Sequence, residues 1–366
     1  MNQILHTQSC PPEWPPRSLL VWLVLCALMI LFIVGVGGTT RLTQSGLSIT
    51  EWKPISGTLP PLNEKAWEEA FNLYKQTPEY QLKHFYMNLE QYKGIFFWEY
   101  FHRLLARSMG LLFALPLAFF WWRGVLPSWL KKRGLIILGL GGLQGLMGWI
   151  MVASGLIRHP FVSHIKLSLH LLLALTVYSF ILWTFFELLS LYTKPVSIDP
   201  SSNKTEPNTL VPSPPPCKPK QFWVLFTFNA LVVLQIAAGG LVAGLRAGKS
   251  YNTFPTMNGL WIPENLYTLS PWISNFFDNG TTVQFNHRVL GWILLIASFK
   301  LPWLLKNTSK SLYRLSYIIP ALTTVQFILG VATLLFKVPV TLGVAHQVTA
   351  FILFTCSLFL LYKCKA

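Results

Sequence analysis

Eight stretches of the chain are apolar over about 20 residues each, the length that crosses the hydrocarbon core of a membrane as a helix. In lipid every backbone N–H and C=O must be satisfied within the protein, which favours helices over open strands. With 52% hydrophobic and 11% charged residues, the 366-residue chain cannot be an ordinary soluble domain. The sequence therefore predicts an all-α polytopic membrane protein. Its predicted spans are about 19–38, 101–122, 134–153, 166–190, 222–243, 286–304, 314–335 and 343–361.

Lysine and arginine are concentrated in alternate connections, as the positive-inside rule expects. If the N-terminus is cytoplasmic, the inner connections carry Arg123, Lys131, Lys132, Arg133, Lys194, Lys204, Lys218, Lys220, Lys306, Lys310, Arg314, Lys363 and Lys365. The formal charge of +16 is thus mostly a matter of topology. Because the basic residues are spread over several loops, they form no nucleic-acid-binding stripe.

The first 17 residues are polar and Pro-rich, with one basic and one acidic residue. They resemble neither a cleavable signal peptide nor an Arg-rich transit sequence. This favours the bacterial inner (cytoplasmic) membrane over the mitochondrial inner membrane, with several passes and a cytoplasmic N-terminus.

The five cysteines form no C-x-x-C motif, and none lies in a predicted outer loop. We therefore expect neither a structural disulfide nor a zinc site, which would need a cluster of sulfur and nitrogen ligands. The cysteines are Cys10, Cys26, Cys217, Cys356 and Cys364.

The sequence contains an internal repeat, so a motif that occurs at the matching place in both halves is stronger evidence than a motif that occurs once. FHRLLARSMG is matched by NHRVLGWILL, GLQGLMG by VQFILG, and LSLHLLLA by GVAHQVTA. These matches keep their order along the chain, which is hard to obtain by chance. The sequence predicts two pseudo-symmetric four-helix bundles. The expected domains are a cytoplasmic tail at 1–18, an N-terminal bundle at 19–190, a cytoplasmic Pro/Ser-rich linker at 191–221 and a C-terminal bundle at 222–366.

Four histidines occupy matched places in this repeat. His102 and His287 lie on the second helix of each half, and His170 and His346 on the fourth, all near the outer ends. A single histidine at such a position is more often an interfacial or hydrogen-bonded residue. Two pairs at matched depth, however, allow two imidazoles to approach a planar iron macrocycle from opposite sides. The sequence predicts two bis-histidine haem sites.

The remaining histidines, His6, His84, His159 and His164, have no repeat partners and are expected to be solvated loop residues. Arginines accompany the predicted sites. Arg103 and Arg288 directly follow two of the ligands, while Arg41 and Arg246 occupy repeat-related outer loops. They are candidate partners of outward-pointing haem propionates, or else ordinary interfacial arginines.

Glu99 is where the repeat fails. It lies three residues before His102 and so on the same helical face, whereas the matching position holds Gln284. A carboxylate near the membrane core is costly, and such residues are functional candidates by default. The asymmetry predicts that the N-terminal half carries out chemistry. An interfacial Glu99 paired with Arg103 is the alternative.

Longer stretches of the sequence carry a family resemblance. They are GGTTRLTQSGLSITEWKPISGTLPPL, IFFWEYFHR, PFVSHIKLSLHLLLA, NTFPTMNGLWIPE, QFNHRVLGW and KVPVTLGVAHQ. Through them the chain resembles the haem A synthase family, in its proteobacterial and mitochondrial branch, whose members convert haem O to haem A for cytochrome oxidase. The resemblance covers nearly the whole chain. Ala106 and Trp292 depart from it, standing where smaller or Tyr-like residues are expected.

The resemblance implies an oxidoreductase that oxidises one porphyrin methyl group to a formyl, through two hydroxylations and a hydroxymethyl intermediate. It assigns Glu99, His102 and His170 to the catalytic half, with both histidines on the iron of the substrate haem O. It assigns His287 and His346 to the iron of a resident haem b.

Two other functions fit the four histidines, namely a bis-histidine dihaem cytochrome b that carries electrons and a haem carrier or insertion factor. The expected partners of the enzyme are a haem O synthase or cytochrome oxidase assembly factors, a ferredoxin-like or quinol electron donor, and the lipid bilayer. A homo-oligomer is compatible with the sequence, and no nucleic acid is expected.

Overall fold

The computed structural model describes residues 16–52, 56–157, 160–193 and 217–365. Eight helices in this part of the chain are long and apolar enough to cross a membrane, as the sequence predicted. The spans are α1 (Ser18–Leu42), α3 (Leu89–Trp122), α4 (Ser128–Ile157), α5 (His164–Thr193), α6 (Pro219–Leu245), α7 (Gly280–Leu305), α8 with α9 (Lys310–Ser316 and Ile318–Leu335) and α10 (Val340–Lys365).

α3 extends well beyond its apolar stretch, and its start is capped by polar residues. α3 begins at Leu89, 12 residues before its predicted start, where the Asn88 side chain accepts from the Gln91 N–H and the Gln91 side chain accepts from the Asn88 N–H. This capping box satisfies N–H groups that have no partner within the helix. The helix therefore continues outward past the hydrophobic segment.

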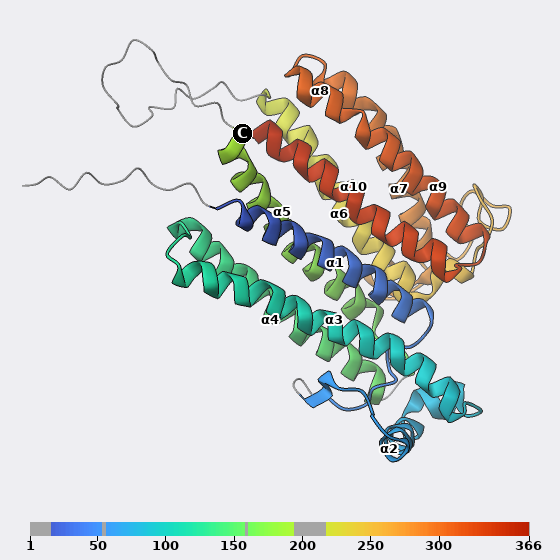
Figure 1. Cartoon of the computed structure of the whole chain (residues 1–366). Helices are drawn as coiled ribbons and strands as arrows, with labels where there is room; N and C mark the ends of the chain where they lie inside the picture. The colour runs from blue at the N-terminus through green and yellow to red at the C-terminus, as the bar shows by residue number, and fades with distance from the viewer. Residues whose placement is uncertain (1–15, 53–55, 158–159, 194–216, 366) are drawn as a thin grey trace, which may run out of the picture.

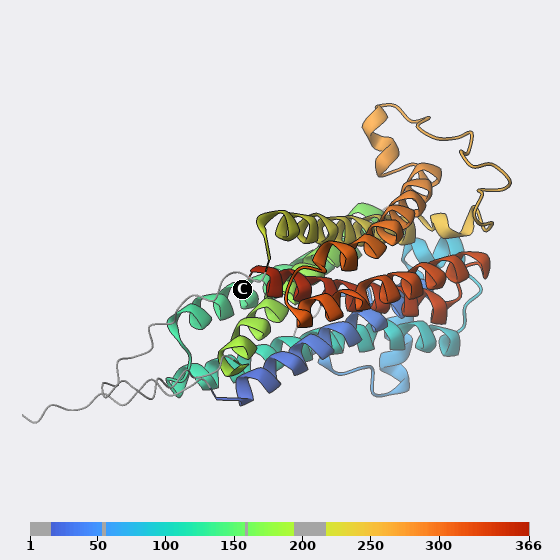
Figure 2. The ribbon, with the colours of Figure 1, turned by 90° about the horizontal axis from the view of Figure 1, so that it is seen from above.

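Four helices form the centre of the molecule. α1 packs against α5 and α10, and α6 packs against the same two helices. α3 and α4 lie outside α1 and α5, while α7 and α9 lie outside α6 and α10 (Figures 1 and 2). One continuous cluster of buried apolar side chains runs through both groups of helices.

Glycines let the central helices approach closely. A Cβ atom on Gly38 of α1 would clash with Gln347 of α10, and one on Gly240 of α6 would press on Ser168 of α5. At both crossings a side chain bonds to the facing backbone. Gln347 donates to the Val34 carbonyl at 3.3 Å, and Ser168 Oγ donates to the Ala237 carbonyl at 2.9 Å.

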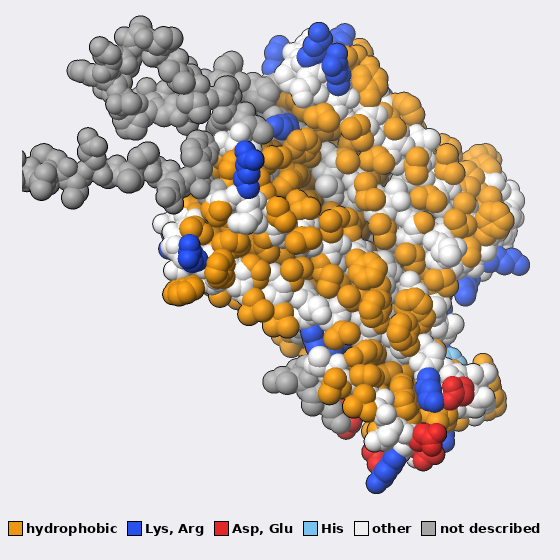
Figure 3. Space-filling model, in the orientation of Figure 1, with side chains coloured by type: hydrophobic (Ala, Val, Ile, Leu, Met, Phe, Trp, Pro, Cys, Tyr) orange, Lys and Arg blue, Asp and Glu red, His pale blue; other side chains and the backbone are white. Residues whose placement is uncertain are grey.

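The two ends of the molecule differ. α1 begins and α10 ends at one end, here called the terminal end (Figure 1). The opposite end, here called the loop end, carries the long connections 43–88 and 246–279. Hydrophobic side chains cover the middle of the face in Figure 3, and lysines and arginines gather toward the ends. This is the distribution expected of a protein immersed in a bilayer.

The first loop-end connection contains a helix that the sequence analysis missed. α2 (Glu64–Lys75) is short and amphipathic, and it is capped by the Asn63 side chain, which accepts from the Ala66 N–H. Its apolar side packs onto α3 through Trp67, whose ring centroid is 5.0 Å from that of Phe96. Short helical turns η1 (Ser56–Thr58), η2 (Tyr80–His84), η3 (Ala247–Lys249) and η4 (Trp272–Phe276) complete the loop-end connections.

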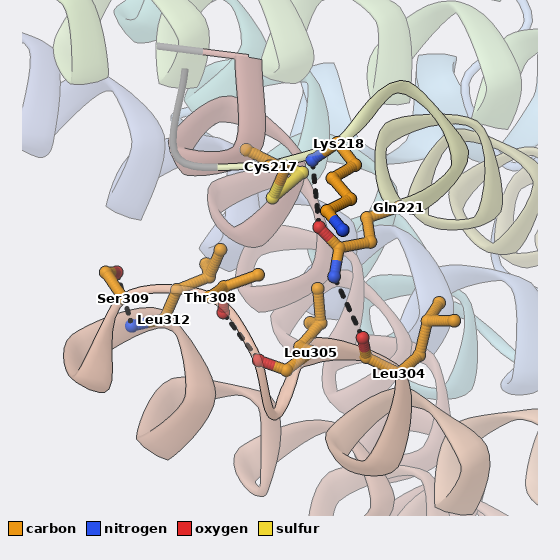
Figure 4. Close-up of a disulfide and its surroundings, with 9 residues drawn as sticks. Cys217, Lys218, Gln221, Leu304, Leu305, Thr308, Ser309 and Leu312 are labelled. Atoms are coloured by element: carbon orange, nitrogen blue, oxygen red, sulfur yellow. Dashed lines mark hydrogen bonds between the residues drawn. A yellow bond between two sulfur atoms is a disulfide. The ribbon is translucent and has the colours of Figure 1, made fainter. Parts of the chain in front are cut away.

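The expectation that the protein has no structural disulfide was wrong. Cys217 and Cys364, 147 residues apart in the sequence, form a disulfide at the terminal end with a Cα–Cα distance of 5.1 Å (Figure 4). Neither C-x-x-C spacing nor a pair of outer-loop cysteines signals this bond in the sequence. Because α6 packs against α10, Cys217, two residues before α6, meets the last turn of α10. Cys26 and Cys356 are free thiols, and Cys10 lies outside the described residues.

We expect replacement of Cys217 by Ser to lower thermal stability without loss of bound haem. The cross-link joins distant points of the chain, and removing such a link typically costs about 2–4 kcal/mol, yet it lies at the end opposite the histidines. The measurement is the unfolding midpoint together with haem content. Cys356→Ser, on the same helix but outside the disulfide, is the matched control. An unchanged midpoint in Cys217→Ser would contradict the prediction.

Candidate functional site

The four predicted histidines lie in two pairs toward the loop end. His287 of α7 faces His346 of α10, with ring centroids 6.4 Å apart and planes at 79°. With a metal–imidazole bond of about 2 Å, two rings on opposite sides of one iron have centroids about 6 Å apart. This pair therefore fits a bis-histidine haem. In the other half, His102 of α3 and His170 of α5 are near enough to interact electrostatically.

Each imidazole rests on a glycine of the neighbouring helix. A Cβ atom built on the glycine would lie only 2.9–3.2 Å from the Cε1 atom of the ring. No side chain fits there unless the ring moves, so the glycine sets the position of the histidine. The four pairs are His102 on Gly37 of α1, His170 on Gly148 of α4, His287 on Gly239 of α6 and His346 on Gly330 of α9.

A glutamine lies one turn before three of these glycines. The Nε2 atoms of Gln144, Gln235 and Gln326 are 3.3, 3.4 and 3.5 Å from the Nε2 atoms of His170, His287 and His346. An amide nitrogen only donates, so each imidazole Nε2 is the acceptor and carries a lone pair. That lone pair is what an iron would bind. The corresponding residue of α1 is Ile33, so His102 has no glutamine at this position.

The glutamines of the C-terminal half also hold the histidine backbone. Gln235 donates to the His287 carbonyl at 3.0 Å, and Gln326 donates to the His346 carbonyl at 2.9 Å. His346 Nδ1 in turn bonds to the Gln326 carbonyl at 3.1 Å. Because the second nitrogen of a metal-bound imidazole sets ring orientation, the Gln326 carbonyl orients the ring of His346, while Gln235 holds the backbone of His287.

We expect Gly330→Val to weaken haem binding in the C-terminal half by about 10–100-fold, the range found for partners that orient metal ligands. The added side chain displaces the His346 ring. Haem content of the purified protein measures the effect. Gly139→Val is the control, since a Cβ atom there meets nothing within 4 Å. Equal haem content in the two variants would show that the glycine does not position the ring.

Glu99 is buried, with 3% of its surface exposed, and its carboxylate is fully engaged. Oε2 accepts from Ser48 Oγ at 2.7 Å and from the Ile49 N–H at 2.8 Å, while Oε1 pairs with Arg103 at 2.6 Å. The ion pair that the sequence analysis held as an alternative is thus present. Glu99 joins the loop after α1 to the turn of α3 that carries His102.

Gln284 takes the place of Glu99 in the other half and binds differently. Its amide nitrogen donates to the backbone carbonyls of Ala247 at 3.0 Å and Tyr251 at 3.3 Å. Both halves therefore use this position to fasten their loop-end connection. Only the N-terminal half does so with a group that can carry a charge and a proton.

The four predicted arginines all bind backbone carbonyls or polar side chains. Arg103 reaches the Ile49 carbonyl besides Glu99, and Arg288 reaches the Tyr251, Thr253 and Thr256 carbonyls. These bonds fix the loop-end connections over the histidines. Each guanidinium carries five N–H donors, so bonds to the loop do not exhaust its capacity.

Arg41 and Arg246 join the two halves. Arg41, in the last turn of α1, donates at 2.9 Å to the Ala243 and Gly244 carbonyls at the end of α6. Arg246, which caps α6, donates to the Gln44 side chain just after α1 at 3.0 Å. We call this reciprocal pair of contacts the arginine clamp. A cation at a helix C-terminus also interacts favourably with the helix dipole.

A buried ionisable group lies in the first loop-end connection. Glu79 is 3% exposed and accepts from the Tyr74 hydroxyl at 3.3 Å. Burial raises the pKa of Glu79 to about 7 and lowers the pKa of Lys83 to about 8. The Tyr74 hydroxyl also lies 2.7 Å from His84 Nδ1, and burial lowers the pKa of His84. The expectation of a fully solvated His84 was therefore wrong, because His84 ends η2 and is half-buried against Tyr74 of α2.

His164 was also expected in a loop, but it begins α5 and its Nε2 lies 2.9 Å from Asp278 Oδ1 of the other half. His6 and His159 lie outside the described residues. Arg107 was overlooked by the sequence analysis, although a cation inside a predicted span is a signal by itself. It is half-buried in α3, five residues from His102.

Comparison with known proteins gives full-length matches. The family of cytochrome oxidase assembly proteins matches residues 20–358. The Heme A synthase of Nitrosomonas eutropha is 42% identical over 348 residues, covering 94% of this chain and 92% of that protein. The Heme A synthase of Nitrosospira multiformis is 42% identical over 372 residues and 99% of both chains. That of Wolbachia pipientis wMel is 41% identical over 345 residues.

Proposed function

The chain belongs to the family of cytochrome oxidase assembly proteins, and we propose from this membership that it is a haem A synthase. The observation that carries the proposal is 42% identity to a Heme A synthase over 99% of both chains. The histidine pairs give it a physical basis, because a haem-modifying enzyme with its own electron carrier needs two haem sites. The enzyme oxidises a methyl group of haem O to the formyl group of haem A.

The reaction proceeds by two hydroxylations of one methyl carbon. The first gives a hydroxymethyl group, the second gives a geminal diol, and loss of water leaves the formyl. Each hydroxylation with dioxygen consumes two electrons and two protons besides the pair taken from the C–H bond. The protein must therefore hold the methyl carbon in place and deliver electrons and protons from outside.

We assign the substrate haem to the N-terminal half at 19–190 and a resident haem b to the C-terminal half at 222–366. His102 and His170 would hold the iron of haem O, and His287 and His346 the iron of haem b. Haem b, when bound, supplies electrons one at a time. Gln235 and Gln326 each contact both the ring and the backbone carbonyl of their histidine, which supports the C-terminal half as the site of the resident haem b. His102, with Ile33 where the others have glutamine, supports the N-terminal half as the exchanging one.

Glu99 is the acid–base candidate of the N-terminal half. Its bonds to Ser48, Ile49 and Arg103 hold the carboxylate in one orientation beside the turn that carries His102. From there it can accept a proton or stabilise positive charge that develops on the macrocycle as the C–H bond breaks. Gln284 can do neither, which is consistent with chemistry in one half only.

The arginines Arg41, Arg103, Arg246 and Arg288 remain our candidates for haem propionates, since all lie toward the loop end near the histidines. We place the loop end outside a bacterial inner membrane and the terminal end in the cytoplasm, following the lysine and arginine distribution. Electrons would come from a ferredoxin-like protein or quinol. A haem O synthase or oxidase assembly factors would deliver or receive the haems.

The test is mass-resolved chromatography of the haems extracted from the protein, expressed in cells that make haem O and have no haem A synthase of their own. Haem A or its hydroxymethyl precursor, together with haem B, is the expected result. Unmodified haems alone, in a preparation given a working electron donor, would instead support the dihaem cytochrome or the haem carrier.

A further inference from the structure

The two halves differ where their outer helices meet. In the C-terminal half three aromatic rings lie together at the seam between α7 and α9. Trp292 of α7 is 4.6 Å from Phe327 of α9, and Phe254 of the loop-end connection is 5.9 Å from Trp292 and 5.8 Å from Phe327, centroid to centroid. We call these three residues the aromatic plug. It adjoins the haem pocket, because a Cβ atom on Gly291 of α7 would lie 3.6 Å from Gln235 Nε2 and 3.8 Å from the Phe327 ring, and Gln235 contacts His287.

The N-terminal half lacks this plug. The offset that relates His102 to His287 puts Arg107 where α7 has Trp292. The offset that relates Gln144 to Gln326 puts Gly145 where α9 has Phe327. A Cβ atom on Gly145 would meet nothing within 4 Å among the described residues. An aromatic pair lies one turn further along α4, where the ring centroid of Trp149 is 6.1 Å from that of Trp52.

The surroundings of the α3–α4 seam agree with an opening. Gly141 and Gly142, one turn before Gly145, also face open space, and α3 and α4 pack less extensively than α7 and α9. Arg107 puts a charge on α3 at the depth where the other half has an indole. Inside a span such a charge requires polar partners, so α3 offers no apolar ring here to match Trp292.

Resting on the proposed function, we propose that haem O enters the N-terminal half sideways from the bilayer, through the seam between α3 and α4. Its isoprenoid tail lies in the space beside Gly145, and haem A leaves by the same route. A porphyrin with a long apolar tail is dissolved in the membrane, so a lateral opening spares the tail from crossing water. The aromatic plug closes the equivalent seam of the C-terminal half and retains haem b.

A second apolar hollow competes for the tail. A cavity of about 590 Å³ lies on the other side of α3, lined by Gly35 of α1, Phe101 of α3 and Val348 of α10 among others. It faces α10 and not α4. Thr40 Oγ of α1 lies 3.2 Å from the Trp98 carbonyl of α3, which ties these two helices together beside the cavity. The seam and this cavity can be blocked separately.

The first test supplies the missing ring. Gly145→Phe has room to fold, and its ring takes the place that Phe327 has in the plug. The purified protein, loaded with haem b, is incubated with haem O in lipid nanodiscs, and uptake is followed by chromatography of extracted haems. We expect uptake at least tenfold slower than in the wild type, with haem b content and its absorption spectrum unchanged. Leu143→Phe, which lies about 200° around α4 and is 49% exposed, is the matched control and leaves uptake unchanged.

Normal uptake by Gly145→Phe overturns the seam proposal. Slow uptake by Val348→Trp, with normal uptake by Gly145→Phe, overturns it in favour of the cavity beside α10. Both outcomes leave the proposed function intact as long as the wild type forms haem A. A wild type that takes up haem O but never oxidises it refutes the function and not the route.

The second test removes part of the plug. Phe327→Ala opens the α7–α9 seam without touching a histidine or a glutamine. Exchange of the resident haem b for iron-57-labelled haem b, measured by mass spectrometry, should become at least tenfold faster than in the wild type. Exchange at the wild-type rate would show that the aromatic plug does not retain haem b.

Discussion

Replacement of Glu99 by Gln should lower haem A formation by at least about 100-fold while haem O and haem b stay bound, since positioned acid–base groups typically contribute 10²–10⁴-fold. The amide can still accept a hydrogen bond from Ser48 or Ile49, so the loop keeps part of its anchor. It cannot take a proton or balance charge on the macrocycle. The readout is product per enzyme by chromatography of extracted haems.

The matched control for this variant is Glu90→Gln. Glu90 lies on the same helix and pairs with Lys93 at 2.6 Å, but it is exposed. We expect its activity to equal that of the wild type, because exposed ion pairs contribute little. If the Glu99→Gln enzyme still formed haem A at the wild-type rate, Glu99 would have only a structural role, as an anchor of the loop after α1. Loss of haem O from the variant would point to the same conclusion.

Replacement of His346 by Ala should remove haem b from the C-terminal half and stop haem A formation. Loss of an axial ligand weakens binding by more than the 10–100-fold typical of the residues that orient ligands. His170→Ala should instead lose haem O and keep haem b. Absorption and electron paramagnetic resonance spectra of the two variants separate the sites, because only the intact bis-histidine site keeps its low-spin signal.

His164→Ala is the control for both ligand variants. His164 begins the same helix as His170 and contacts Asp278, away from the two pairs. We expect both haems to remain bound to it. If His346→Ala retained stoichiometric haem b with a low-spin spectrum, the assignment of His346 as a ligand would be wrong.

The spans were predictable from the sequence because each one is specified locally. Twenty apolar residues in lipid have few alternatives to a helix, and all eight are present. The order-preserving repeat likewise brought the four histidines to attention, since an internal match needs no knowledge of the fold. Where the spans end was less predictable, because capping residues such as Asn88 act outside the apolar stretch.

Other features depend on contacts between distant segments. Cys217 and Cys364 are 147 residues apart, and only the packing of α6 against α10 unites them. α2 is amphipathic, and its apolar face is recognisable only once α3 extends beyond the membrane to receive it.

The glycine supports were partly visible in the sequence. Gly148 and Gly330 match each other in the repeat, as the glutamines one turn earlier do. Their purpose became clear only from the imidazole lying against each of them. Arg107 and Trp292 were both readable from the aligned repeats. Their meaning required the ring contacts of Phe254 and Phe327, one of which comes from a connection outside the repeat motifs.

The arginine clamp has a consequence for how the chain is made. α1 is synthesised about 200 residues before α6. Arg41 is therefore in the membrane before the Ala243 and Gly244 carbonyls that it binds have been made. Gln44 is likewise synthesised long before Arg246, which donates a hydrogen bond to it. The first half therefore reaches its finished form only after synthesis of the second has passed α6. A truncated or split gene would yield an N-terminal half whose outer end is incomplete, and a membrane chaperone could act during that interval.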